Sequence, residues 1–292
     1  MKCLMAEVNI SEGRDQSLID EVTNAMLAGD PVEVMEIASD ADHNRTVYTY
    51  KGEPRAVLEA TKRLAGKAVE KIDMTKHHGA HPRMGAVDVV PFIPVKDVTV
   101  EEALDICHEF AKYLGGLGVP IYYYEDACTK EERRLLPKIR KGQYEALEEK
   151  MKDPEWEPDE GPKTFSPKSG ATVTGVRFPL VAYNVNLNTT DIEIGKKIVK
   201  AVRGATGGYQ YVRAIALPLE ERGGIVQISM NLTNYKKTPI HRVFETIKSE
   251  ASQYGVGIVD CELVGPVPVY ALEDVLKYYL RVQSFSMDQI YM

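Results

Sequence analysis

A β-α-β-β-α-β order of expected elements occurs twice along this chain, and such a duplication limits the folds that it can adopt. Hydrophobic periodicity predicts the first set as a strand over 5–10, a helix over 17–27, strands over 32–38 and 46–50, a helix over 53–72 and a strand over 87–95. It predicts the second set as a strand over 180–187, a helix over 191–202, strands over 209–217 and 224–232, a helix over 239–254 and a strand over 257–264. We therefore expect an α+β sandwich of two similar ferredoxin-like βαββαβ subdomains, with mixed sheets and helices on the outer faces.

Short similar strings in the two halves of the sequence support the duplication. Val87-Asp88 before a proline-flanked apolar run has a counterpart in Val259-Asp260. We expect subdomains over 1–178 and 179–292. Additional elements are expected as a helix over 101–114, a strand over 119–124, a charged helix over 129–150 and a short helix over 272–280.

Composition excludes several classes of protein. The 292 residues are 44% hydrophobic and carry a formal net charge of -7, which argues against a protein built to hold nucleic acid. An anionic ligand would then be bound by a few local Arg or Lys side chains. No stretch reaches the roughly 18 apolar residues of a membrane span, so we expect a cytoplasmic protein without a membrane partner.

The four cysteines suggest neither a zinc ribbon nor a disulfide framework. Cys3, Cys107, Cys128 and Cys261 are widely spaced, without a Cys-x-x-Cys pair. A reducing compartment is therefore expected.

The segment 76–86 holds three of the six histidines within a turn broken by glycine and proline. Histidine exchanges a proton near neutral pH because its ordinary pKa is about 6.5. His77, His78 and His81 are therefore candidates for proton transfer, while one or two of them, His77 or His78, are expected only to bond loop backbone. We expect no metal, since the run contains no Cys, Asp or Glu to complete a site.

A long connector over 153–172 contains the only tryptophan and several prolines. Loops of this length in compact domains usually have a function or are disordered. We favour a function, because the backbone N–H groups and the lysines could hold a polar ligand while Phe165 covers an aromatic ring. A mobile linker is the alternative.

Several sequence strings, taken together in their order and spacing, resemble the glutamate formimidoyltransferase (glutamate formiminotransferase) family. The similarity extends from the first strand to about Tyr279. The strings are Asn44-Arg45-Thr46-Val47, His81-Pro82-Arg83-Met84-Gly85-Ala86 with Asp88, Pro91-Phe92-Ile93-Pro94-Val95, Gly170-Ala171-Thr172 with Thr174-Gly175, and Asn184-Val185-Asn186-Leu187.

The resemblance implies a reaction of one-carbon metabolism and a set of site residues. A member transfers the formimino group from N-formimino-L-glutamate to N5 of the co-substrate tetrahydrofolate, giving 5-formiminotetrahydrofolate and L-glutamate during histidine degradation. It also implies two similar subdomains, a homodimer and His81 as the catalytic residue. Vertebrate relatives continue into a cyclodeaminase domain, so a separate cyclodeaminase would receive this product. The implied folate-contacting residues are Gly161, Pro162, Lys163, Thr164, Phe165, Ser166, Pro167, Lys168, Ser169 and Gly170.

The chemistry calls for the same residue types. N5 must lose a proton as it attacks, which suits His81 as a general base. The amidinium of the donor is cationic, so Asp40, Asp42 or Asp88 could stabilise it, although Asp in turns often only bonds backbone amides. Carboxylates of the donor suit Arg45 or Arg83, with Asn44 beside them.

The sequence departs from the family pattern at two places, and two functions other than formimino transfer are possible. Ser169 stands where relatives often have an aromatic residue, so the stacking on the pterin is expected to differ. The strand before Asn44 offers Glu36, Ala38 and Ser39 where relatives tend to have Asp. The alternatives to formimino transfer are a non-catalytic folate-binding module and a transferase that uses N-formylglutamate to form 5-formyltetrahydrofolate.

Overall fold

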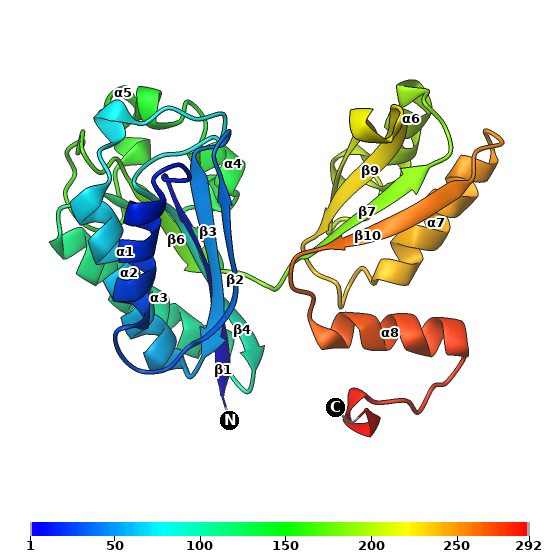
Figure 1. The fold of residues 1–292 in the computed structure, drawn as a ribbon, viewed down its shortest axis with the longest axis horizontal. Coiled ribbons are helices and arrows are strands. Elements are labelled where there is room, and N and C mark those ends of the chain that lie inside the picture. Colours follow the sequence, from blue (N-terminus) through cyan, green and yellow to red (C-terminus); the bar gives the residue numbers. More distant parts are fainter. Residues whose placement is uncertain (1, 291–292) are drawn as a thin grey trace. The chain divides into compact units, whose positions relative to one another are not determined.

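The computed structural model describes residues 2–290, which fall into two compact units that meet between Arg177 and Phe178 in the sequence. Each unit is a β-sheet with helices packed on it (Figure 1). The predicted α+β fold is therefore confirmed.

The first unit is built on a six-stranded mixed sheet. Strands β2, β3, β1 and β4 lie in that order and are antiparallel, whereas β6 is parallel to both β4 and β5. The first four strands with their two connecting helices reproduce the ferredoxin-like order. The strands are β1 (Cys3–Ile10), β2 (Glu33–Asp40), β3 (Arg45–Gly52), β4 (Val87–Lys96), β5 (Ile121–Glu125) and β6 (Thr172–Val176). Strand β6 was not expected from the sequence pattern.

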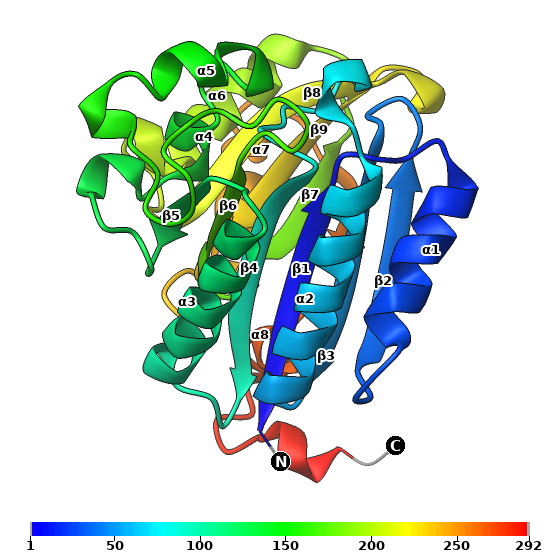
Figure 2. The same cartoon turned by 90° about the vertical axis from the view of Figure 1, so that its left-hand side faces the viewer.

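Three helices cover one face of this sheet (Figure 2): α1 (Gln16–Leu27), α2 (Pro54–Lys71) and α3 (Val100–Gly116). The sequence defines where each of them begins. The Asp15 carboxylate accepts a hydrogen bond from the Leu18 amide, α2 begins with a proline, and Thr99 forms a capping box with Glu102. Alternate residues of β1 are buried, and these pack with the apolar stripes of the helices into one core.

A smaller cluster forms on the other face of β4, β5 and β6. Neighbouring residues of a strand point to opposite faces, so Tyr122 and Tyr124 belong to this cluster while Tyr123 belongs to the main core. The segment that connects β5 to β6 supplies much of the rest, including Ile139 and Leu147.

The predicted charged helix over 129–150 was wrong. In its place are short turns, among which α4 (Leu136–Ile139) and α5 (Leu147–Lys150) are the α-helical pieces. Pro137 can begin a helix but not continue one, and Gly142 and Gln143 adopt positive φ values of 88° and 57°. These residues break the helix despite the favourable charged composition around them.

The second unit repeats the ferredoxin-like arrangement and adds the helix α8 after it. Its sheet order, β10-β7-β9-β8, corresponds strand for strand to β4-β1-β3-β2 of the first unit, and all its pairs are antiparallel. The predicted mixed pairing therefore holds only in the first unit, where β5 and β6 add parallel strands. The elements are β7 (Val181–Leu187), α6 (Ile192–Val202), β8 (Val212–Leu219), β9 (Ile225–Leu232), α7 (Ile240–Ser252), β10 (Ile258–Val264) and α8 (Val269–Leu280).

Between residues 2 and 290, none of the helices is both long and apolar enough to cross a membrane.

Candidate functional site

The histidine segment and the long connector, which sequence analysis singled out separately, lie side by side. Gly85 and Gly170 form an isolated β-bridge, and hydrogen bonds of 2.8 and 3.0 Å join Ala86 N to Ser169 O and Ala171 N to Met84 O. A Cβ atom at Gly85 would lie 2.4 Å from Ser169 O, so only glycine permits this approach. The end of the connector is therefore fixed against the strand entry that follows His81.

The turn between β2 and β3 holds the histidine segment from another side. The Asn44 side chain accepts from Gly13 N at 2.9 Å and donates to His78 O at 3.0 Å. Asn44 is buried and has a positive φ of 49°. Ala80 N also donates to the carbonyl of Asp42, whose side chain is exposed. In this structure the Asn44 amide thus connects backbone segments.

His81 is half-buried, and its ring contacts a cation. Its Nε2 atom lies 2.9 Å from Nη1 of Arg45, at the start of β3. Because a guanidinium only donates, Nε2 accepts, and the ring proton is then on Nδ1. The ring of His43 stands edge-on at 6.4 Å from His81, and Asp40 bonds Nδ1 of His43 at 2.7 Å. Asp40 thus connects to His81 through His43.

Burial and nearby cations keep the His81 ring neutral. Burial lowers its pKa most, followed by the nearby cations Arg45, Arg140, His43 and Arg83, and together they bring it to about 3. A neutral imidazole can accept a proton, whereas an imidazolium cannot.

Arg83 forms an ion pair with a carboxylate of the protein itself. Its guanidinium is buried and forms two bonds to Glu145, of 2.6 and 3.0 Å, and its Nε donates to Nδ1 of His77 at 3.2 Å. Nε2 of His77 in turn donates to Asn44 O at 2.9 Å. His77 therefore bonds loop backbone, as the sequence suggested for one of the first two histidines.

Asp88 is buried and pairs with an arginine that was not among the predicted site residues. The carboxylate is 1% exposed, accepts from Met84 N at 2.9 Å and forms an ion pair with Arg140. Burial raises the pKa of Asp88, and the adjacent Arg140 opposes this shift. Arg140 stands in the charged stretch 138–141, which looks like a solvated face, so no signal in the sequence predicted it here.

Arg45 differs from Arg83 and Arg140 because it makes no ion pair within the described residues. Burial, and then Arg140, lower its pKa. The Nε atoms of both Arg45 and Arg140 are buried without a hydrogen-bond partner in residues 2–290. The charge of Arg45, which has no carboxylate partner, and the nearby Arg140 favour an anion next to His81.

The connector residues 161–170 form an anchored loop. Phe165 packs against Tyr144 with ring centroids 5.5 Å apart, and the Tyr144 hydroxyl donates to Pro167 O at 2.6 Å. Lys168 donates to Glu70 O at 2.7 Å, and Ser169 bonds Ser166 at 2.7 Å. In the described part of the chain, no group of three His, Cys, Asp or Glu side chains is placed to hold a metal ion.

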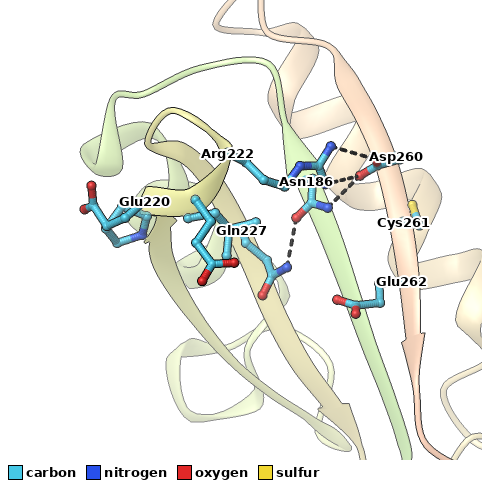
Figure 3. A pocket seen from close by; sticks show the side chains of 10 residues that line it. Asn186, Glu220, Arg222, Gln227, Asp260, Cys261 and Glu262 are labelled. Carbon is cyan, nitrogen blue, oxygen red and sulfur yellow. Dashed lines mark hydrogen bonds and ion pairs between the residues drawn. The ribbon is translucent and has the colours of Figure 1, made fainter.

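A polar cavity of about 580 Å³ lies in the second unit (Figure 3). Arg222 forms two bonds to Asp260, of 2.9 and 3.1 Å, and Asn186 links Asp260 to Gln227. The lining residues all come from the second unit, whereas His81 belongs to the first. Asn186 is part of one of the strings that carry the family resemblance.

Comparisons with known proteins agree with this architecture. A family model described as the N-terminal subdomain of the formiminotransferase domain matches residues 3–177, and one described as the formiminotransferase domain matches 182–290. The glutamate formimidoyltransferase of Streptococcus pyogenes is 47% identical over 95% of this chain and 93% of its own length. That of Thermoplasma acidophilum is 43% identical over 97% of this chain and 93% of its own. The formimidoyltransferase-cyclodeaminase of Gallus gallus is 42% identical over 94% of this chain, which spans 52% of that enzyme. This chain therefore belongs to the formiminotransferase family.

Proposed function

We propose that this protein transfers the formimino group from N-formimino-L-glutamate to N5 of tetrahydrofolate, giving 5-formiminotetrahydrofolate and L-glutamate. Family membership supports the reaction class. The observation that carries the proposal is a neutral imidazole, His81, held beside an unpaired arginine and next to the anchored loop 161–170. In this proposal the two units are the subdomains of one transferase.

His81 has the chemistry of the proton carrier. Tetrahydrofolate supplies N5 as the nucleophile. A neutral His81 takes the proton that N5 loses as the new C–N bond forms, and returns it to the glutamate nitrogen as the old C–N bond breaks. Asp40 holds His43 next to His81 and adds negative charge near the cationic amidinium, and Asp42 lies in the same turn.

The donor's carboxylates fit the unpaired donors near His81. The half-buried Arg45 makes no ion pair within residues 2–290, and a carboxylate is the best acceptor for a guanidinium. We assign substrate binding to Arg45. Arg83 and Asn44 contribute by holding the loops around the site, since their side chains already bond Glu145, His77 and backbone groups.

The loop over 161–170 is our candidate for the folate contact. Its anchoring leaves the paired rings of Phe165 and Tyr144 as an aromatic surface, and Lys163, which pairs with Glu157, lies near its start. Ser169 is buried and bonded to Ser166, so it cannot replace an aromatic residue in stacking.

We further propose a homodimer in a reducing cytoplasm. Edge strand β2 exposes Val34, Met35 and Ile37 to between 36% and 38%, which suits a protein partner. Four free cysteines agree with a reducing compartment. The product would then pass to a separate cyclodeaminase.

The test is to mix the purified protein with formiminoglutamate and tetrahydrofolate and to follow formation of the 5-formimino product. Formylglutamate is the parallel donor. Faster turnover with formylglutamate would assign the formyl reaction, and tight folate binding without turnover of either donor would assign the non-catalytic module.

A further inference from the structure

Arg45 occupies the atom of His81 that a general base must keep free. Its Nη1 donates to Nε2 at 2.9 Å, so the only lone pair of the neutral ring points at a guanidinium. In this arrangement His81 cannot take a proton at Nε2. Some event must remove the Arg45 hydrogen bond before a proton can be transferred there.

The hydrogen bond from Arg45 to His81 can be exchanged for a stronger bond to a carboxylate. It makes no ion pair in the described residues, it is half-buried, and its Nε has no partner. An arginine–carboxylate pair is stronger than a hydrogen bond to a neutral ring. Arg140, which also has a buried Nε without a partner, is near enough to lower the pKa of Arg45. An arriving carboxylate would therefore meet Arg45, whose charge has no carboxylate partner in the described residues, with Arg140 nearby.

We propose that Arg45, besides binding the donor, holds His81 inactive until a carboxylate of the donor draws the guanidinium away and frees Nε2. This inference rests on the proposed function, because it takes His81 as the base. It adds that donor binding switches the base on, so that proton transfer is coupled to the presence of glutamate-type substrate.

The charges that face His81 give the switch a measurable sign. They are Arg45 at the start of β3, His43 with Asp40 at the β2–β3 turn, Arg140 with Asp88 behind the segment, and Arg83 with Glu145. In the free protein, burial and the cations hold the pKa of His81 at about 3. A bound carboxylate that neutralises Arg45 must raise this pKa.

Imidazole NMR on protein labelled with ¹⁵N-histidine tests the switch, with L-glutamate as the probe. The His81 signals are assigned from their loss in His81→Ala. We expect saturating L-glutamate to shift the Nε2 signal and to raise the His81 titration midpoint by at least one pH unit, which is a tenfold rise in proton affinity. An Nε2 signal that does not respond to bound L-glutamate would overturn the inference.

Arg45→Met removes the donor and the charge at similar length. We expect its His81 midpoint to be raised already without ligand and to change little with L-glutamate. The matched control is Arg55→Met, which removes an exposed arginine paired with Glu109 and should leave the His81 signals unchanged. If Arg45→Met does not fold, the wild-type titration decides alone.

Kinetics separate this inference from the proposed function. The pH dependence of kcat/KM reports the free enzyme and that of kcat reports the bound enzyme. We expect kcat to show an acidic limb at higher pH than kcat/KM. Coincident limbs with normal turnover would overturn the switch alone, whereas absence of product from the wild-type protein would overturn the proposed function.

Discussion

At the scale of single residues, three histidines that lie within four positions of one another have three different environments. His78 is exposed, His77 is buried between Asn44 O and Arg83, and His81 is half-buried among cations. Only His81 combines access with a bond to a side chain that has no other charged partner. The sequence could identify the segment, but the environments of His77 and His81 depend on Asn44 and Arg45, more than 30 positions away.

His81→Ala should lower turnover by roughly a hundredfold or more, because a general base typically contributes that much. The variant should keep its fold, since the imidazole is half-buried and lies outside the hydrophobic core. His78→Ala, at an exposed position three residues before His81 in the same segment, is the matched control and should keep its rate. Steady-state assays with both substrates give the comparison, and an unchanged rate in His81→Ala would remove this residue from the mechanism.

His77 should make the protein less stable as the pH falls. Burial, and then Arg83, lower its pKa, although its bond to Asn44 O opposes this. The unfolded chain therefore binds the proton more readily, so stability rises with pH. The contribution is complete above about pH 6.5, the ordinary histidine value, and is lost as the pH falls below it.

His77→Gln should reduce this dependence, because an amide can accept from Arg83 and donate to Asn44 O without titrating. Urea unfolding at pH 7 and pH 5 measures the effect, with His78→Gln as the exposed control. We expect the variant to lose less stability than the control between the two pH values. Equal losses would assign the acid sensitivity to other groups.

At the scale of elements, the repeated strands and helices were predictable and the connector between β5 and β6 was not. The helices of both repeats have an apolar stripe, and the first helix of each has a recognisable start, Asp15 before α1 and Asp191 before α6. The region 129–150 has the charge pattern of a helix, but Pro137 and the left-handed Gly142 and Gln143 divide it. Local pattern could not bring Arg140 to Asp88, because that contact depends on how the divided segment folds back onto the sheet.

The junction between the histidine segment and the folate loop should be sensitive to one methyl group. Gly85→Ala would place Cβ within 2.4 to 2.8 Å of Ser169 and Ala171 backbone atoms, so the two segments must separate. We expect a loss of stability of about 1–3 kcal/mol, as for other overpacking changes, and a larger KM for tetrahydrofolate.

Gly116→Ala is the control for this change, because a Cβ at that position in α3 meets nothing within 4 Å. It should leave KM unchanged and stability equal or higher, since alanine favours helix over glycine. Urea unfolding and folate-dependent kinetics on both variants make the comparison. A Gly85→Ala protein with wild-type KM and stability would show that the bridge to Gly170 does not position the loop.

At the scale of the whole molecule, duplication explains why one sequence pattern gave two units of the same topology. The β4-β1-β3-β2 and β10-β7-β9-β8 orders are equivalent, yet the chemistry is distributed unequally. The first unit adds β5, β6 and the segment between them, which brings Arg140 and Glu145 to the surroundings of His81. The second unit adds α8 to the repeat and presents a polar cavity along β7, β9 and β10.

Each unit has its own hydrophobic core, so we expect the two to unfold as separate cooperative units. Ile247→Ala, at a fully buried site of the second unit, should destabilise that unit by roughly 2–5 kcal/mol. Hydrogen exchange of its strand amides should accelerate, while the urea midpoint of Trp156 fluorescence, which reports the first unit, should not move. Ile106→Ala in α3 should do the reverse. If Ile247→Ala shifts the Trp156 midpoint by the same free energy, the chain unfolds as one cooperative structure.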